Sequence, residues 1–257
     1  IPKEIEKMIW HLENPPENSL MSSWHTFKLV SSTDVKVTLD GQGADEQLGG
    51  YFHYLLSYMT SLSFFDLIGE TKYCLKIPNA KTYVFVGFFL GIVRLIFGEN
   101  LLKRVAKIIL KREFEPNLNK KLVDDINSNL ITLIHYADHT SMAFSIESRM
   151  PFMDYRLVDF LATVPACYKM RNGWTKYLAR LAFDGKLPDE VNWRQDKMGW
   201  AIPEKKWFSG NLENWFSKKI DECQISKQLI YETNIKTLSK NLKKLNISFF
   251  EKLFLKS

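Results

Sequence analysis

Residues 35–51 have the sequence VKVTLDGQGADEQLGGY, and this stretch decides which fold we expect for the chain. Apolar and polar residues alternate up to Asp40, which is the period of a β-strand, so we predict a strand over Lys36–Asp40. A glycine-rich turn with two carboxylates follows directly. Ligands of open parallel sheets bind beyond the carboxyl ends of the strands, so this turn is the first candidate for a binding site.

The residue types in this turn suit phosphate and magnesium. Gly41 and Gly43 would let backbone N–H groups approach a phosphate closely. Asp45 and Glu46 supply carboxylate oxygens, the hard ligands that Mg²⁺ prefers. Glycine and aspartate are also ordinary turn residues, so the pattern alone does not distinguish a nucleotide site from a plain turn.

Most of the remaining chain is predicted to be helical. The pattern is helical and rather hydrophobic from about Tyr54 to Arg112. Within it, Tyr83–Phe97 is a nearly continuous apolar run that only Arg94 interrupts. A spanning helix needs about 20 apolar residues, so we predict a buried helix instead. The helix after it has a basic polar face that could contact an anionic membrane, although a solvated face is the commoner explanation.

Composition indicates an ordinary globular protein. The 257 residues, 46% hydrophobic and 25% charged, suffice for one large domain or two small ones. The net charge of +6 can help to attract nucleotides, but we expect no nucleic-acid partner. Three widely spaced cysteines favour neither a disulfide framework nor a metal site and suit a reducing compartment. The chain starts at Ile1 without a signal-like segment, as a fragment would, and we expect a cytoplasmic location.

Four sequence blocks carry a family resemblance. The first is the strand and turn quoted above. Residues 138–143 (DHTSMA) lead into residues 147–154 (ESRMPFMD), and residues 171–178 (RNGWTKYL) follow. The last block contains Leu187-Pro188, Trp193-Arg194, Lys197 and Gly199. In this order the blocks resemble the signatures of asparagine synthetases and the related β-lactam synthetases. The resemblance extends roughly from Glu13 to Trp207 and is poor between Phe52 and about Leu133.

The resemblance implies an α/β fold of the adenine-nucleotide alpha-hydrolase (PP-loop) type, here mainly helical because the N-terminal strands are absent from residues 1–257. A lone strand leaves its edges unsatisfied, so we expect Lys36–Asp40 at a sheet edge without its usual neighbours. Such an edge could pair with another chain, and a homodimer is possible. We predict a partial synthetase domain over residues 1–210 and a C-terminal helical extension over residues 211–257.

The resemblance also implies an activity. Members of this family adenylate a carboxylate with Mg-ATP, release pyrophosphate, and let an amine attack the acyl-adenylate. The implied enzyme is a carbon–nitrogen ligase with ATP and Mg²⁺ as cofactors. Its implied substrates are a carboxylate, aspartate or an analogue, and ammonia from glutamine. Membrane contact is not expected.

Site residues follow from the same resemblance. Asp40, Gly41 and Gly43 match positions that bind the nucleotide, and Asp45 matches a Mg²⁺ ligand. Lys176 matches the lysine that stabilises developing negative charge in both half-reactions. Glu147 matches the acid of a Glu-x-Arg block, with Arg149 as its expected ion-pair partner. We expect Asp45 and Lys176 to converge on one cleft, with Glu147 nearby.

The sequence departs from the family pattern in three ways. The phosphate loop Ser-Gly-Gly-x-Asp-Ser and the N-terminal glutaminase domain do not occur in residues 1–257, so we expect the chain alone to be catalytically incomplete. Gln42 stands where asparagine synthetases usually carry a glutamate, which can accept a proton from the attacking ammonium. An amide has no such basicity, although Gln42 can still orient a substrate. His139 stands where the family more often has Arg or Lys.

Gln42 therefore leaves the carboxylate substrate open, and a sugar acid is one alternative to aspartate. A second alternative is a β-lactam-synthetase-like ligase, but that branch carries a tyrosine where Gln42 stands. A third is a non-catalytic nucleotide-binding or interaction module, which would explain the missing loop.

Overall fold

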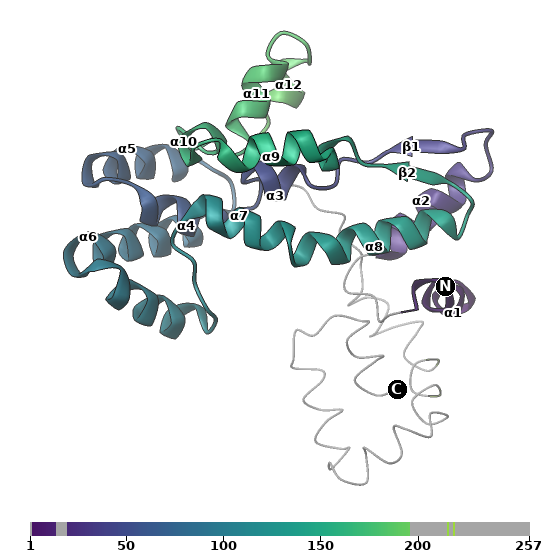
Figure 1. The fold of residues 1–257 in the computed structure, drawn as a ribbon, viewed down its shortest axis with the longest axis horizontal. Coiled ribbons are helices and arrows are strands. Elements are labelled where there is room, and N and C mark those ends of the chain that lie inside the picture. Colours follow the sequence, from purple (N-terminus) through teal and green to yellow (C-terminus); the bar gives the residue numbers. More distant parts are fainter. Residues whose placement is uncertain (1, 14–19, 196–214, 216–217, 219–257) are drawn as a thin grey trace. The chain divides into compact units, whose positions relative to one another are not determined.

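The structure, a computed structural model, describes residues 2–13, 20–195, 215 and 218. Contacts divide the chain into two units (Figure 1). The first unit comprises residues 1–38, 135–148 and 199–257, and the second comprises residues 39–134 and 149–198. Nearly all of the predicted extension over residues 211–257, and the motif residues Lys197 and Gly199, lie outside the described residues.

The first unit is built on two helices, α1 (Pro2–Leu12) and α2 (Leu20–Val30). Ile5, Met8 and Leu12 recur at helical spacing and are fully buried in one cluster with Trp24. Glu4 anchors this packing, because its carboxylate accepts hydrogen bonds from Lys28 Nζ at 2.7 Å and Trp24 Nε1 at 2.9 Å. These two bonds lower the pKa of Glu4 to about 2.

The second unit is helical as far as the structure describes it. It contains α3 (Ala44–Leu48), α4 (Tyr54–Ser61), α5 (Phe64–Cys74), α6 (Lys81–Leu110), α7 (Leu118–Ile126), the 3₁₀ helix η1 (Pro151–Met153), α9 (Tyr155–Thr163), α10 (Ala166–Lys169), α11 (Tyr177–Phe183) and α12 (Asp189–Asn192). Helix α8 (Asn129–Met142) and the strands β1 (Val37–Leu39) and β2 (Glu147–Arg149) cross between the units. The mainly helical character predicted from the sequence is confirmed for the described residues.

Strand β1 has a neighbour, contrary to the prediction of a lone strand. It pairs with β2 in a two-stranded sheet (Figure 1). Glu147 N–H donates to Lys36 O at 2.9 Å, and Asp40 N–H donates to Arg149 O at 2.8 Å. Because residue numbers increase in the same direction along both strands between these two bonds, the strands are parallel. Strand β2 was not predicted, since three residues of mixed polarity are too short to show a strand period.

Helix α6 contains the long apolar run, but only one of its faces is buried. Val84, Gly87, Gly91 and Val93 are among its buried residues, whereas Phe85 is 63% and Ile96 66% exposed. The prediction of a buried helix is therefore wrong for the outward face. The run is apolar on all sides, and such a sequence does not reveal that one side lacks a protein partner.

The buried face of α6 depends on two glycines. A Cβ atom added at Gly91 would lie 2.8 Å from Leu67 of α5 and 3.2 Å from the Met59 carbonyl oxygen of α4. One added at Gly87 would lie 2.9 Å from Met59 Sδ. The pair, four residues apart, thus lets α6 approach α4 closely, as small residues do at helix crossings.

We expect Gly91→Ala to lower the free energy of unfolding by about 1 kcal/mol, because the added methyl group overpacks this crossing. Gly69→Ala is the matched control, since Gly69 also lies inside a helix but has open space around its Cβ position. The control should gain up to about 1 kcal/mol from helix propensity. Urea denaturation measures the free energy of unfolding of both variants. Equal stabilisation by the two substitutions would contradict the packing described for α6.

Candidate active site

The turn after β1 is closed by Asp40. The Asp40 side chain accepts a hydrogen bond from Gln42 N–H at 3.2 Å, which is the pattern of an Asx turn. Partial burial raises the pKa of the Asp40 carboxyl group. Gly41 is exposed, and nothing lies within 4 Å of its Cβ position. The backbone between Asp40 and Gln42 is therefore accessible at the carboxyl end of a parallel strand.

Helix α3 starts at Gly43, where the backbone needs glycine. Gly43 has a left-handed φ of 89°, and a Cβ atom there would lie 2.6 Å from Met153 Sδ. One turn later, Gln47 Nε2 donates to the Phe152 carbonyl oxygen at 2.5 Å. These contacts hold η1 against α3, so the first motif block and residues 151–154 are packed together.

Asp45 and Lys176 form an ion pair, although they are far apart in the sequence. Lys176 Nζ lies 2.9 Å from Asp45 Oδ1. Both side chains are partly exposed, 32% for Lys176 and 20% for Asp45. Gly50 lies directly beneath the pair: a Cβ atom there would be 1.7 Å from Asp45 Oδ1 and 2.5 Å from Lys176 Cε. The doublet of glycines after α3 thus leaves the space that the pair occupies.

Lys176 is held by its neighbours in a strained conformation. It precedes α11 rather than lying in it, and its φ of 54° and ψ of 34° are left-handed, which is rare for residues other than glycine. Arg180 donates through Nε to the Thr175 carbonyl oxygen at 2.8 Å and stacks over the Trp174 ring. Strain of this kind persists only where the surroundings fix it, and it is common at functional sites.

A second anchor fixes the turn before Lys176. Glu70 of α5 accepts hydrogen bonds from Asn172 N–H at 2.9 Å and Gly173 N–H at 3.3 Å. Gly173 has a φ of 77°, and its Cβ position is 2.8 Å from the Tyr73 carbonyl oxygen. The block at residues 171–178 is therefore attached to the helical core, which orients Lys176 toward Asp45.

Behind the pair, buried polar groups satisfy one another. Glu46 is 2% exposed and accepts a hydrogen bond from the Tyr51 hydroxyl at 2.9 Å. Burial raises the pKa of Glu46. Burial alone would also raise the pKa of Asp125, but the nearby His53 ring and the hydrogen bond from Lys121 Nζ at 2.6 Å lower it to about 2. Glu46 thus points into the core, away from the role of a metal ligand that the sequence suggested for it.

The structure brings most of the predicted site residues into one unit. Asp40, Gly41, Gln42, Gly43, Asp45 and Lys176 all belong to the second unit. Glu147 lies in β2 and belongs to the first unit. Its position near Asp45 stays a prediction, as does its ion pair with Arg149. The structural roles of Gly50, Glu70 and Arg180 were not predicted. The sequence contains a signal for two of them: the Gly-Gly doublet for Gly50, and the spacing of four residues from Lys176 for Arg180.

A magnesium ion fits Asp45 only together with a ligand that brings further oxygen atoms. No group of three or more His, Cys, Asp or Glu side chains able to hold a metal occurs in the part of the chain that the structure describes. Mg²⁺ commonly uses one or two carboxylates with substrate phosphates and water. The partly exposed Asp45 carboxylate suits that kind of shared site.

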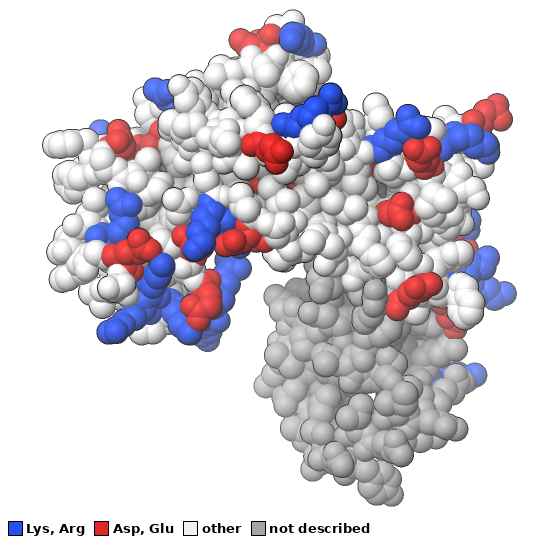
Figure 2. All heavy atoms as spheres, in the orientation of Figure 1, with Lys and Arg blue, Asp and Glu red and all other residues white. Residues whose placement is uncertain are grey.

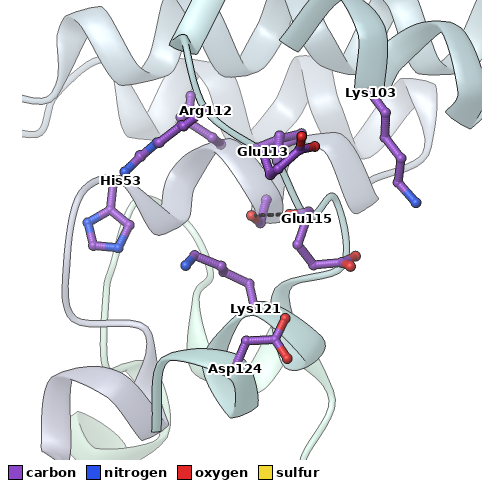
Figure 3. A pocket seen from close by; sticks show the side chains of 10 residues that line it. His53, Lys103, Arg112, Glu113, Glu115, Lys121 and Asp124 are labelled. Atoms are coloured by element: carbon purple, nitrogen blue, oxygen red, sulfur yellow. Dashed lines mark hydrogen bonds between the residues drawn. The ribbon is translucent and has the colours of Figure 1, made fainter. Parts of the chain in front are cut away.

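The second unit also has a cavity of about 420 Å³ that contains none of the predicted site residues. Figure 3 shows His53 and Arg112 on one side of it and Glu113 and Glu115 on the other. Lys121 and Asp124 add one charge of each sign. Because cations and carboxylates nearly balance, the cavity favours neither an anionic nor a cationic ligand.

Similarity to known proteins shows the family of this chain. The sequence pattern of the family described as asparagine synthase matches residues 1–254. The chain belongs to the asparagine synthase family. Asparagine synthetase 1 (glutamine-hydrolysing) of Bacillus subtilis is 29% identical over 250 residues, which cover 86% of this chain and 39% of that protein.

Two further relatives differ in how much of this chain they match and at what identity. Asparagine synthetase 3 (glutamine-hydrolysing) of Bacillus subtilis is 36% identical over 172 residues, covering 63% of this chain and 26% of that protein. The amidase chry2 of Gibberella zeae is 22% identical over 270 residues, covering 86% of this chain and 40% of that protein. The chain thus spans well under half the length of the curated relatives that it matches.

Proposed function

We propose that this member of the asparagine synthase family activates a carboxylate with ATP as an acyl-adenylate and transfers it to an amine. The observation that supports the proposal is the Asp45–Lys176 ion pair at 2.9 Å. It joins an acidic turn at the carboxyl end of a parallel strand to a lysine that an independent motif block presents. A metal-binding carboxylate beside a fixed cation is what the transfer of a nucleotidyl group requires.

The turn Asp40–Gly43 would bind the nucleotide. Gly41 leaves its backbone open, and Gly43 can adopt its left-handed conformation at the start of α3 without strain. Helix α3 has only five residues, so its dipole is a minor contribution. Recognition would rest on the backbone N–H groups that the turn exposes.

Asp45 would hold Mg²⁺ jointly with the phosphates of ATP. When bound, this ion would offset negative charge on the departing pyrophosphate. Lys176, already 2.9 Å from Asp45 Oδ1, would stabilise the charge that develops on the reacting oxygens. Gly50, Glu70 and Arg180 act as positioning residues, because each holds Asp45, Lys176 or the chain before Lys176 in place.

Gln42 bears on which carboxylate is the substrate. It is partly exposed beside the Asp40 turn, as a substrate-facing residue should be. Its amide can donate and accept hydrogen bonds but cannot take a proton from an attacking ammonium. We therefore propose aspartate or another carboxylate, such as a sugar acid, as the substrate, with ammonia from glutamine as the nitrogen donor.

We expect pyrophosphate release from ATP to depend on an added carboxylate, and Gln42→Glu to raise amide formation with aspartate about tenfold or more, because it supplies a general base. A panel of aspartate, glutamate and sugar acids should be assayed with both proteins. The complete synthetase that contains these residues is the right sample. Residues 1–257 alone should release no detectable pyrophosphate, because the phosphate loop is not among them.

Gln42→Asn is the matched control, because it keeps the amide and should not gain activity. If no carboxylate in the panel stimulates pyrophosphate release, the proposed adenylation is wrong. If release occurs but Gln42→Glu gains nothing with aspartate, the carboxylate pocket rather than the base has diverged.

A further inference from the structure

Exposed apolar side chains are concentrated on two helices of the second unit. Thirteen of the twenty-eight large apolar side chains that are exposed in the described residues belong to α5 and α6. These two helices make up only about a fifth of that part of the chain. Phe65 of α5 is 83% exposed, and Ile108 of α6 is 77% exposed. Contiguous apolar surface of this kind indicates a binding partner.

The first half of α6 presents this surface as a stripe. Phe85, Phe89 and Ile96 follow one another at intervals of four and seven residues, which places them on one helix face. They are 63%, 51% and 66% exposed. Leu95 beside them is 38% exposed, whereas Phe88 and Ile92 pack partly against the core. Arg94 is the only charged residue between Phe85 and Ile96, and it is only partly exposed. In Figure 2 much of the left edge of the second unit, where Figure 1 shows α5 and α6, is accordingly uncharged.

Length and composition would let α6 cross a membrane, but its packing argues against that. The opposite face of α6 packs against α4 and α5 at Gly87 and Gly91. Arg94 donates from Nη2 to the Leu62 carbonyl oxygen at 3.1 Å. This bond holds a charged side chain in the middle of the apolar run against the protein. At Gly98 the backbone leaves the helical conformation, with φ 80° and ψ 179°. The straight segment before it is shorter than the about 20 residues that a span needs.

The second half of α6 adds positive charge. From Glu99 to Leu110 the helix has three basic residues and one acidic residue, a net charge of +2, and the whole helix has a net charge of +4. The basic residues are Lys81, Arg94, Lys103, Arg104 and Lys107. Lys103 pairs with Glu99 at 2.6 Å, but both groups are about half exposed, and such pairs exchange readily. Arg104 has no ion-pair or hydrogen-bond partner among the described residues.

We propose that α6 binds the surface of an anionic lipid bilayer, with its aromatic stripe in the interface and its basic second half at the headgroups. An apolar face next to clustered Lys and Arg residues is the pattern of interfacial helices, and anionic lipid supplies the complementary charge. A second copy of this chain would place the basic second half of α6, net charge +2, against its own like charge in a symmetric interface. A nucleic acid would leave the Phe and Ile side chains unmatched. The proposal replaces the expectation of no membrane contact drawn from the sequence. It goes beyond the reaction proposed above and does not depend on it.

Vesicle co-sedimentation with the full chain tests this proposal. Wild type should bind vesicles of equal parts phosphatidylcholine and phosphatidylglycerol, and bind vesicles of phosphatidylcholine alone at least about tenfold more weakly. Phe85→Ser combined with Phe89→Ser should weaken binding about tenfold or more, since the stripe supplies the buried apolar area. Lys103→Gln combined with Arg104→Gln should weaken binding several-fold and reduce its dependence on salt.

Two controls carry matched changes elsewhere. Phe160 of α9 is 59% exposed and Lys186 is exposed, and neither belongs to α5 or α6. Phe160→Ser and Lys186→Gln should bind vesicles as wild type does. The proposal fails if wild type does not bind the anionic vesicles, or if the controls lose as much binding as the α6 variants. It also fails if wild type is a stable dimer that Phe85→Ser combined with Phe89→Ser dissociates, because the stripe would then be a protein interface.

Discussion

Replacing Lys176 by methionine is expected to lower kcat by about 10²- to 10³-fold while KM changes by less than about threefold. The chain's own residues hold the lysine 2.9 Å from Asp45. Its charge therefore matters most when negative charge builds up on the reacting oxygens, and removal of one preorganised donor has an effect of that size. Steady-state kinetics of pyrophosphate release with the complete synthetase measure both constants.

The left-handed backbone of Lys176 separates a functional role from a structural one. A non-glycine residue with φ 54° costs about 1 kcal/mol, which glycine does not incur. Lys176→Gly should therefore be as inactive as Lys176→Met, but its free energy of unfolding should be higher than that of Lys176→Met. Lys111 is a lysine with the same φ of 54° at the end of α6. Lys111→Gly should gain similar stability and keep full turnover.

A large loss of stability in Lys176→Met or Lys176→Gly would contradict this assignment, because it would make the lysine a structural element. A selective rise in KM with unchanged kcat would assign Lys176 to substrate binding alone. Asp45→Asn offers a further check. Since its carboxylate and the ammonium are in contact, the effects of the two substitutions should not add in the double variant.

The sequence predicted those parts of the fold that local chemistry determines. The strand before the turn and the mainly helical character of the rest depend on the pattern of neighbouring residues, and both were predicted. Strand β2 could not be predicted, because its three residues form a strand only when β1 lies beside them. Nor could the outward face of α6, since an apolar run does not show which of its sides is covered.

The same distinction applies to the site. Asp45 and Lys176 were predicted from the motif blocks that contain them, but the blocks do not show how the two side chains are held. Glu70 and Arg180 act from two helices, α5 and α11, that share no local pattern with the acidic loop. Gly50 lies within a motif, yet a glycine in a turn usually indicates backbone conformation. Here its role depends on a side chain that arrives from residue 176.

Replacing Gly50 by alanine is accordingly expected to lower kcat about a hundredfold without unfolding the protein. The added Cβ would lie 1.7 Å from Asp45 Oδ1 and 2.7 Å from Asp45 Cγ, so the carboxylate must leave its position. Gly50 is not among the residues with positive φ, and alanine can therefore adopt its backbone conformation. The substitution should therefore disturb the Asp45–Lys176 ion pair without straining the backbone.

Magnesium dependence distinguishes this displacement from a general loss of packing. A misplaced Asp45 carboxylate should raise the Mg²⁺ concentration needed for half-maximal activity, whereas Gly69→Ala, with open space at its Cβ position, should leave it unchanged. Asp45→Ala removes the closest atoms that the new methyl group would meet, although Lys176 Cε at 2.5 Å remains. Gly50→Ala should therefore cause a smaller loss in an Asp45→Ala background than in wild type. If its effect in that background were as large as in wild type, the methyl group would act elsewhere, and the proposed packing of Gly50 beneath the ion pair would be wrong.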